Sequence, residues 1–176
     1  MTKPITEQRL YNITLFYLER FEASSLKIKQ MLERRIHKEK TKGAVVPENY
    51  PQLIQNVIQK MTHLGYINDT RFAGNQIRQM AVAGKSKSFI LNKLSQVGIK
   101  KEEASALLAT FEDENESSDL VRAQKWLKKH RKGFYRRENA ELFYQKDLAA
   151  LARAGFSFDT ATQALQTQPN EDDFYF

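Results

Sequence analysis

The feature that most restricts the fold of this chain is a pattern that occurs twice, at a constant offset of 57 residues. Both copies place leucines at helical spacing and follow them with a glycine that can close a helix. Such a stripe also arises by coincidence in helical proteins, but six matches at one offset favour a true repeat. The matched pairs are Leu91 and Leu148, Leu94 and Leu151, Gly98 and Gly155, Ile99 and Phe156, Ala104 and Ala161, and Leu108 and Leu165.

An earlier copy fits less closely, with Leu32 in the place of Leu94 and Ile54 in the place of Ala104. Three units of three helices follow from these copies. Each unit alone buries little surface, so we expect neighbours to stack into an elongated, curved array. The predicted units are 6–67 with a basic loop insertion at 37–50, then 68–116 and 117–168, followed by an acidic tail at 169–176.

Helix is expected throughout, which makes the predicted fold class all-α. The chain has only seven Gly and four Pro, and it shows neither two-residue apolar alternation nor an Asn-Gly hairpin signal. Residues suited to start helices stand before the apolar stripes. They are Thr6, Ser24 or Ser25, Pro51 in a first turn, Ser118 before a seventh helix ending near Lys132, and Ser157 or Asp159.

Two further local predictions concern the ends of helices. Between Leu64 and Ala73 one helix ends and another begins, with Gly65 in the left-handed conformation and Asp69 as the cap of the new helix. An eighth helix is expected over about 135–154, and residues 112–118 are expected to form an acidic linker.

The composition excludes several classes of protein. There is no cysteine, so disulfides and thiolate metal sites are excluded. No apolar run is long enough to span a bilayer, and the N-terminus lacks the apolar core of a signal peptide, so we expect a cytoplasmic protein. The 28 Lys and Arg against 21 Asp and Glu give a net charge of +7, which favours an acidic partner.

The strongest signal for binding is the segment 122–137, which carries eight basic and no acidic residues. They are Arg122, Lys125, Lys128, Lys129, Arg131, Lys132, Arg136 and Arg137. Such a surface could neutralise phosphates or meet an acidic protein, and the interleaved Trp126, Phe134 and Tyr135 could stack on unpaired bases. The alternative is a solvated helix face, with Trp126 in the core, which is the interpretation favoured for that residue.

The charges themselves favour a binding role. Eight like charges without compensating acids repel one another, and an acidic partner would relieve that repulsion. Reversing Arg131 and Lys132 to Glu is therefore expected to weaken binding and leave stability nearly unchanged.

Two other basic stretches are weaker candidates. Lys85 and Lys87 precede a helix and could hold a phosphate, although a plain helix connection is favoured because the glycine-rich phosphate signature is absent. Lys38, Lys40 and Lys42 could form an electrostatic arm or a passive loop. The three histidines are isolated and no nucleophile has an evident base, so we expect neither an enzyme nor a metal site or cofactor.

Several segments together resemble the RecX family of regulatory proteins. The junction Gly65-Tyr66-Ile67-Asn68-Asp69-Thr70-Arg71-Phe72-Ala73 matches a motif that follows the family's first repeat, although Asn68 stands where Asp is common. A helix with Arg78, the turn at Gly84 and the segment 91–99 follow as in the family, but Lys85 replaces a frequent proline. The stretches 133–137 and 146–156 look like the third repeat of its alphaproteobacterial branch.

The resemblance implies three tandem three-helix repeats and a target, the RecA recombinase polymerised on single-stranded DNA. The protein would lie in the filament groove and lower ATP hydrolysis, strand exchange and coprotease activity, in DNA repair and the SOS response. Candidate contacts are Arg71, Arg78, Lys85 and Lys87 together with the basic residues of 122–137.

Two other functions stay open. The first is a stand-alone module for single- or double-stranded DNA, whose affinity would fall steeply with salt. The second is a helical scaffold for another acidic protein. In each case we expect a monomer without membrane contact.

Overall fold

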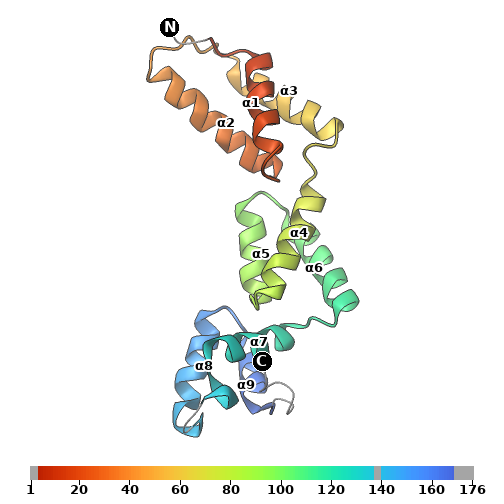
Figure 1. The fold of residues 1–176 in the computed structure, drawn as a ribbon, viewed down its shortest axis with the longest axis vertical. Coiled ribbons are helices and arrows are strands. Elements are labelled where there is room, and N and C mark those ends of the chain that lie inside the picture. The colour runs from red at the N-terminus through yellow and green to blue at the C-terminus, as the bar shows by residue number, and fades with distance from the viewer. Residues whose placement is uncertain (1–3, 137–139, 169–176) are drawn as a thin grey trace. The chain divides into compact units, whose positions relative to one another are not determined.

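The computed structural model describes residues 4–136 and 140–168, and these form nine α-helices and two short 3-10 helices without any strand (Figure 1). The all-α prediction is confirmed, and the α-helices follow one another as three sets of three. The chain divides into two compact units, the first reaching Ala73 and including Val97–Ile99, the second comprising Gly74–Gln96 and the chain from Lys100 onward. The exact repeat boundaries and the elongated, curved outline stay predictions.

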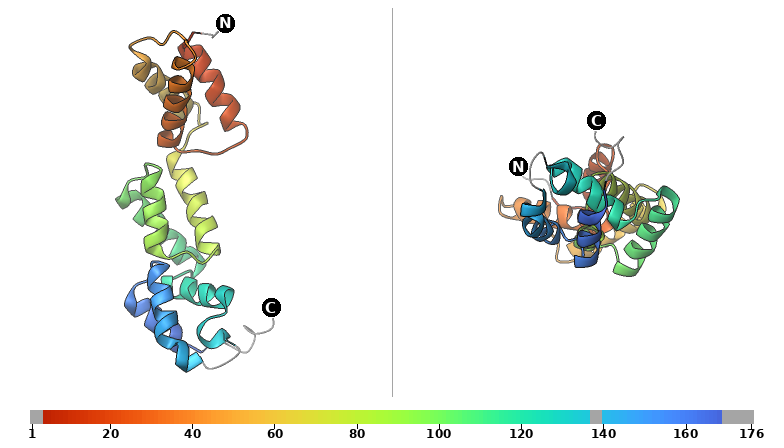
Figure 2. Two further views of the ribbon diagram at one scale, coloured as in Figure 1. Left: turned by 90° about the vertical axis from the view of Figure 1, so that its left-hand side faces the viewer. Right: turned by 90° about the horizontal axis from the view of Figure 1, so that it is seen from below.

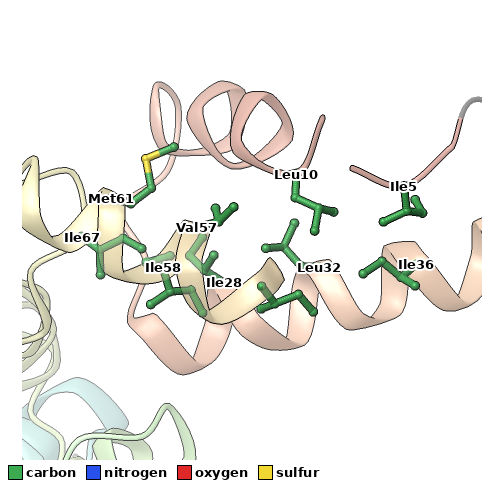
Figure 3. Close-up of a cluster of buried hydrophobic side chains, with 11 residues drawn as sticks. Ile5, Leu10, Ile28, Leu32, Ile36, Val57, Ile58, Met61 and Ile67 are labelled. Carbon is green, nitrogen blue, oxygen red and sulfur yellow. The ribbon is translucent and has the colours of Figure 1, made fainter. Parts of the chain in front are cut away.

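The first unit contains α1 (Glu7–Leu18), α2 (Ser25–Lys40), α3 (Tyr50–His63) and the start of α4 (Asp69–Val82). Its helices begin where the sequence predicts. The hydroxyl of Thr6 accepts a hydrogen bond from the Arg9 N–H, that of Ser24 accepts from the Lys27 N–H, and Pro51 lies in the first turn of α3. Each helix directs one apolar stripe inward, and these stripes meet in a core (Figure 3) of eleven residues: Ile5, Leu10, Ala23, Ile28, Leu32, Ile36, Ile54, Val57, Ile58, Met61 and Ile67.

The second unit contains the rest of α4, then α5 (Lys87–Gln96), α6 (Lys101–Asn115), α7 (Asp119–His130), α8 (Tyr144–Arg153) and α9 (Phe158–Gln166). Helix α9 packs against both α7 and α8 (Figure 2). Ser118 and Ser157 cap α7 and α9 as predicted. The third set of helices, α7 to α9, has its own core, which we call the third core: Ala123, Leu127, Leu148, Leu151, Phe156, Ala161, Ala164 and Leu165.

The predicted basic loop at 37–50 is wrong in its first part, because α2 continues to Lys40. Lys38 and Lys40 therefore lie in the last turn of that helix, where positive charge stabilises the exposed carbonyl end. Lys42 alone of the three lysines follows the helix. Likewise α6 continues to Asn115, so the first half of the expected linker at 112–118 is helical.

The predicted helix over 135–154 is also wrong at its start. Gly133–Tyr135 and Ala140–Phe143 are 3-10 helices, and α8 begins only at Tyr144. The cause is tertiary, since the Gly133 N–H donates to the buried carboxylate of Asp147 at 2.9 Å and fixes a turn there. Residues 137–139 and the predicted acidic tail at 169–176 lie outside the described residues.

The same hydrogen-bonded junction occurs once in each unit. In the first, the Ser24 hydroxyl donates to the Val97 carbonyl at 2.7 Å and the Ser25 N–H donates to Asp69 at 2.7 Å. In the second, the corresponding bonds run from Ser86 to the Ala154 carbonyl at 2.9 Å and from the Lys87 N–H to Asp119 at 2.8 Å. The acceptors Val97 and Ala154 are themselves 57 residues apart, as the repeat predicts.

This junction corrects one capping prediction. Asp69 accepts from the Ser25 N–H and so caps α2, whereas the Asn68 side chain accepts from the Arg71 N–H at 2.8 Å and caps α4. Gly65 has a φ of +76°, which confirms the predicted left-handed helix end. Local sequence therefore located the start of α4 but not the long-range task of Asp69.

Candidate nucleic-acid interface

Arg122 is not part of any binding surface, which corrects the sequence prediction. Its side chain is fully buried between α6 and α7. The guanidinium donates to the Ser117 carbonyl at 2.5 Å, to Glu112 at 2.5 Å and to Asp119 at 3.0 Å. A buried arginine persists only with such partners, because an unpaired charge away from water is costly. Arg122 therefore holds the connection from α6 to α7 together.

Lys132 and Arg136 are also engaged inside the protein. Both donate to Asp147, whose side chain is fully buried: Lys132 at 3.2 Å, and Arg136 through two bonds at 2.6 and 2.8 Å. Burial acts to raise the pKa of the Asp147 carboxyl, but the bonds from Arg136, the Gly133 N–H and Lys132 outweigh it and lower that pKa from 3.8 to about 2. The Asp147 hydrogen bond in turn raises the pKa of Arg136.

The expectation that segment 122–137 lacks compensating acids is thus wrong. Glu112, Asp119 and Asp147 supply that compensation from outside the segment. One sequence signal could have found Asp147: it lies four residues before the buried Leu151, on the apolar face of α8. An acid on an apolar helix face needs a cationic partner, and the basic segment supplies two.

The remaining basic side chains of this segment do lie at the surface. Lys125, Lys129 and Arg131 are exposed, and Lys128 is half-buried. Arg131 ends α7 in the left-handed conformation, with a φ of +51°. Trp126 is partly buried against the third core, which confirms the core interpretation for this residue. The centre of its ring lies 4.3 Å from the centre of the His130 ring. Arg137 lies outside the described residues.

A pocket of about 370 Å³ adjoins this surface. Helix α7 contributes Lys125 and Lys128 to its wall, and the 3-10 helix after α7 contributes Phe134 and Tyr135. The sequence predicted that these aromatics are interleaved with charge, and the structure brings both of them to one hollow with two of the lysines. The hollow therefore combines aromatic faces with positive charge.

The other candidates are scattered. Arg71 is half-exposed and pairs with Glu22 at 2.9 Å, and Arg78 is exposed. The Lys85 ammonium lies 4.9 Å from the centre of the Phe89 ring, and Lys87 is exposed at the start of α5. At that helix start the Lys87 and Phe89 N–H groups already donate to Asp119 and Ser86, so the turn is built as a helix connection.

Metal ligation and membrane spanning find no support in the described residues. Within 4–136 and 140–168, no group of three or more His, Cys, Asp or Glu residues is arranged to hold a metal ion. No helix in these ranges has both the length and the apolar character needed to cross a membrane.

Known proteins resemble the chain along most of its length. The regulatory protein RecX of Myxococcus xanthus (strain DK1622) is 29% identical over 170 residues, which cover 95% of this chain and 89% of the relative. The crystal structure of RecX from Lactobacillus salivarius matches with a TM-score of 0.68 over 91% of this chain and 94% of that one, at 22% identity. The chain is therefore similar to RecX proteins in both sequence and fold.

A second RecX relative, from Agrobacterium fabrum, is 36% identical over 109 residues. The match covers 60% of this chain and 56% of that protein, so the chain spans about half of that relative's length. A further crystal structure of a regulatory protein RecX matches with a TM-score of 0.69 at 21% identity, covering 92% of this chain and 72% of that one. A scan against protein-family models finds no match.

Proposed function

We propose that this protein binds the RecA filament on single-stranded DNA and inhibits its ATPase, recombinase and coprotease activities. It would thereby act in DNA repair and the SOS response, as a non-catalytic monomer in the cytoplasm. Similarity to proteins named regulatory protein RecX supports a role in regulation. The observation that supports an acidic nucleoprotein as the target is the basic face of α7. We define this face as the exposed Lys125, Lys129 and Arg131 together with the half-buried Lys128.

The basic face suits such a target because its charges reach the surface. Lys125 and Lys129 are four residues apart on α7 and so lie on one side of the helix, with Arg131 at its end. A filament offers phosphates and acidic protein surfaces repeatedly, so many weak contacts can add to a strong interaction. The buried Arg122 contributes nothing to this face.

The test is the rate of ATP hydrolysis by RecA on excess single-stranded DNA, titrated with this protein. The variant Lys129→Glu/Arg131→Glu reverses two exposed charges of the basic face. A matched control, Arg34→Glu/Lys38→Glu, makes the same charge change on exposed positions of α2. We expect the wild type and the control to inhibit well below one protein per RecA, and the α7 variant to lose that inhibition.

Two outcomes would contradict the proposal. Inhibition that appears only when the protein coats the strand would indicate competition for DNA, and hence a stand-alone nucleic-acid-binding module. Equal loss of inhibition in the α7 variant and the α2 control would show that net charge matters and the α7 face does not.

A further inference from the structure

We infer that the pocket beside the basic face of α7 holds one unpaired nucleobase together with an adjacent phosphate. The pocket measures about 370 Å³ and lies within the usual range of small-ligand sites, about 300–1,000 Å³. It is formed by α7, by the 3-10 helix Gly133–Tyr135 and by the end of α9. All three elements belong to the second unit.

The lining has the three groups that such a ligand requires. Phe134 is half-buried and offers an aromatic face, on which any base can stack. Lys125 and Lys128 are three residues apart on α7 and both line the pocket, so their ammonium groups can bind a phosphate from the same side of the helix. The Gln124 amide can both donate to and accept from a base edge. No acidic side chain lines the pocket among the described residues, so no carboxylate repels a phosphate there.

The two aromatic residues that line the pocket are held in place by the hydrogen bonds to Asp147, which we call the Asp147 cluster. Phe134 and Tyr135 are bracketed in sequence by Lys132, Gly133 and Arg136, and all three bracketing residues donate to the same buried carboxylate. Tyr135 also packs against the third core. A ligand therefore meets a preorganised ring and does not have to order it, which reduces the entropic cost of binding. In this account Asp147 is a positioning residue.

The chemistry selects single strands. A base within a duplex is paired and stacked, so its face reaches the Phe134 ring only after costly extrusion, whereas a base in a single strand is accessible. The choice of single-stranded DNA as the ligand rests on the proposed function, but the pocket is tested without RecA, on naked strands.

The experiment compares two fluorescein-labelled strands of equal length, oligo-dT and an abasic strand with the same phosphates, by fluorescence anisotropy. Phe134→Leu removes the aromatic face and keeps the apolar bulk. We expect it to weaken binding of oligo-dT by about 5- to 100-fold and to leave the abasic strand unchanged, with Phe134→Trp restoring the wild-type preference. Phe16→Leu, at an exposed aromatic of α1, is the control and should change neither affinity.

Charge is tested separately. Lys125→Gln/Lys128→Gln should weaken binding of both strands and lower the salt slope by about 0.7 for each phosphate that the protein no longer neutralises. Circular dichroism checks that each variant is folded. The fluorescence of Trp126, the single tryptophan of the wild type, does so for the variants that add no second tryptophan.

Weakening that is equal for both strands, or absent, in Phe134→Leu would overturn the pocket assignment. Base-selective binding without inhibition of RecA would instead refute the proposed function and leave the pocket standing. Inhibition of RecA by a protein whose oligo-dT binding ignores Phe134 would do the reverse.

Discussion

Buried charge distinguishes the first set of helices from the third. In the described part of the first set, the fully buried polar side chains are the uncharged Thr14 and Ser24. In the third set and the turn before it, Arg122 and Asp147 are buried as ions, each surrounded by oppositely charged or polar partners. One set of helices is thus held mainly by apolar contacts, whereas the other also relies on ionic clusters that must be complete to be stable.

The two hydrogen-bonded junctions show the contrast at matched positions. Three residues after Asp69 stands Phe72, which is 4% exposed, and three residues after Asp119 stands Arg122, which is fully buried. Both residues stand at the same position in sequence relative to the capping aspartate of their helix. Burial of Phe72 is favourable because an apolar side chain leaves water, whereas burial of Arg122 is favourable only while its hydrogen-bond acceptors remain. The same position after the capping aspartate is therefore buried as an apolar residue in one junction and as an ionic residue in the other.

The largest expected loss of stability comes from removing the buried Arg122 beside Asp119. Arg122→Ala leaves Glu112 and Asp119 without their cation and opens a cavity, so we expect a loss of about 3–5 kcal/mol in the free energy of unfolding. Urea denaturation followed through the fluorescence of Trp126 measures this loss, because Trp126 and Arg122 both belong to the second unit. Arg122→Met keeps the volume and should cost less than Arg122→Ala. A loss below about 1 kcal/mol for Arg122→Ala would remove the contrast with Phe72.

A second prediction tests how tightly each junction closes. At Gly98 the φ is +89° and an added Cβ would lie 2.7 Å from the Leu26 Cβ, so Gly98→Ala should cost about 2–4 kcal/mol. Gly65, with a φ of +76° and open space around it, is the control, and its replacement by Ala should cost only about 1–2 kcal/mol.

The second junction sharpens this test. At Gly155 the added Cβ would meet the Ser86 hydroxyl at 2.7 Å, and that hydroxyl can rotate away by giving up its bonds with the Ala154 carbonyl and the Phe89 N–H, whereas the Leu26 Cβ cannot move without its backbone. Gly155→Ala should therefore cost less than Gly98→Ala in the same denaturation assay. An equal cost for Gly65, Gly98 and Gly155 would mean that the backbone conformation alone sets the effect.

The Asp147 cluster predicts a pH dependence that is specific to the third set. Because folding lowers the Asp147 pKa from 3.8 to about 2, its contribution is complete above pH 3.8 and is lost as the pH falls toward 2. A difference of nearly two pKa units corresponds to about 2 kcal/mol. Asp147→Asn should lose about that much at pH 7, and its stability should decline less than that of the wild type between pH 4 and pH 2. Parallel pH profiles for the two proteins would refute the assignment.

The sequence predicted local events well and long-range polar contacts poorly. Thr6, Ser24, Pro51 and Ser118 mark helix starts because a cap acts within three or four residues. The 57-residue repeat reflects apolar stripes, which are local patterns too. The predictions for Asp69 and Arg122 are wrong, and Asp147 was not singled out at all, because the partners of these residues are set by tertiary packing. The sequence does not distinguish a buried charge from an exposed one.

The smallest expected change in stability belongs to the exposed part of the basic segment. Lys129 and Arg131 lie at the surface, so Lys129→Glu/Arg131→Glu should lower the free energy of unfolding by no more than about 1 kcal/mol, through negative charge at the C-terminal end of α7, while weakening binding of the filament. Lys132→Glu is the informative comparison. In the wild type the Lys132 ammonium lies 3.2 Å from the buried Asp147 carboxylate, and the variant places a second carboxylate there. Lys132→Glu should therefore be clearly less stable than Lys129→Glu/Arg131→Glu. Thermal denaturation of both variants at neutral pH measures the difference. If both variants were equally stable, the division of this segment into buried ionic and exposed binding residues would fail, because the Asp147 cluster would then tolerate the same charge that the surface does.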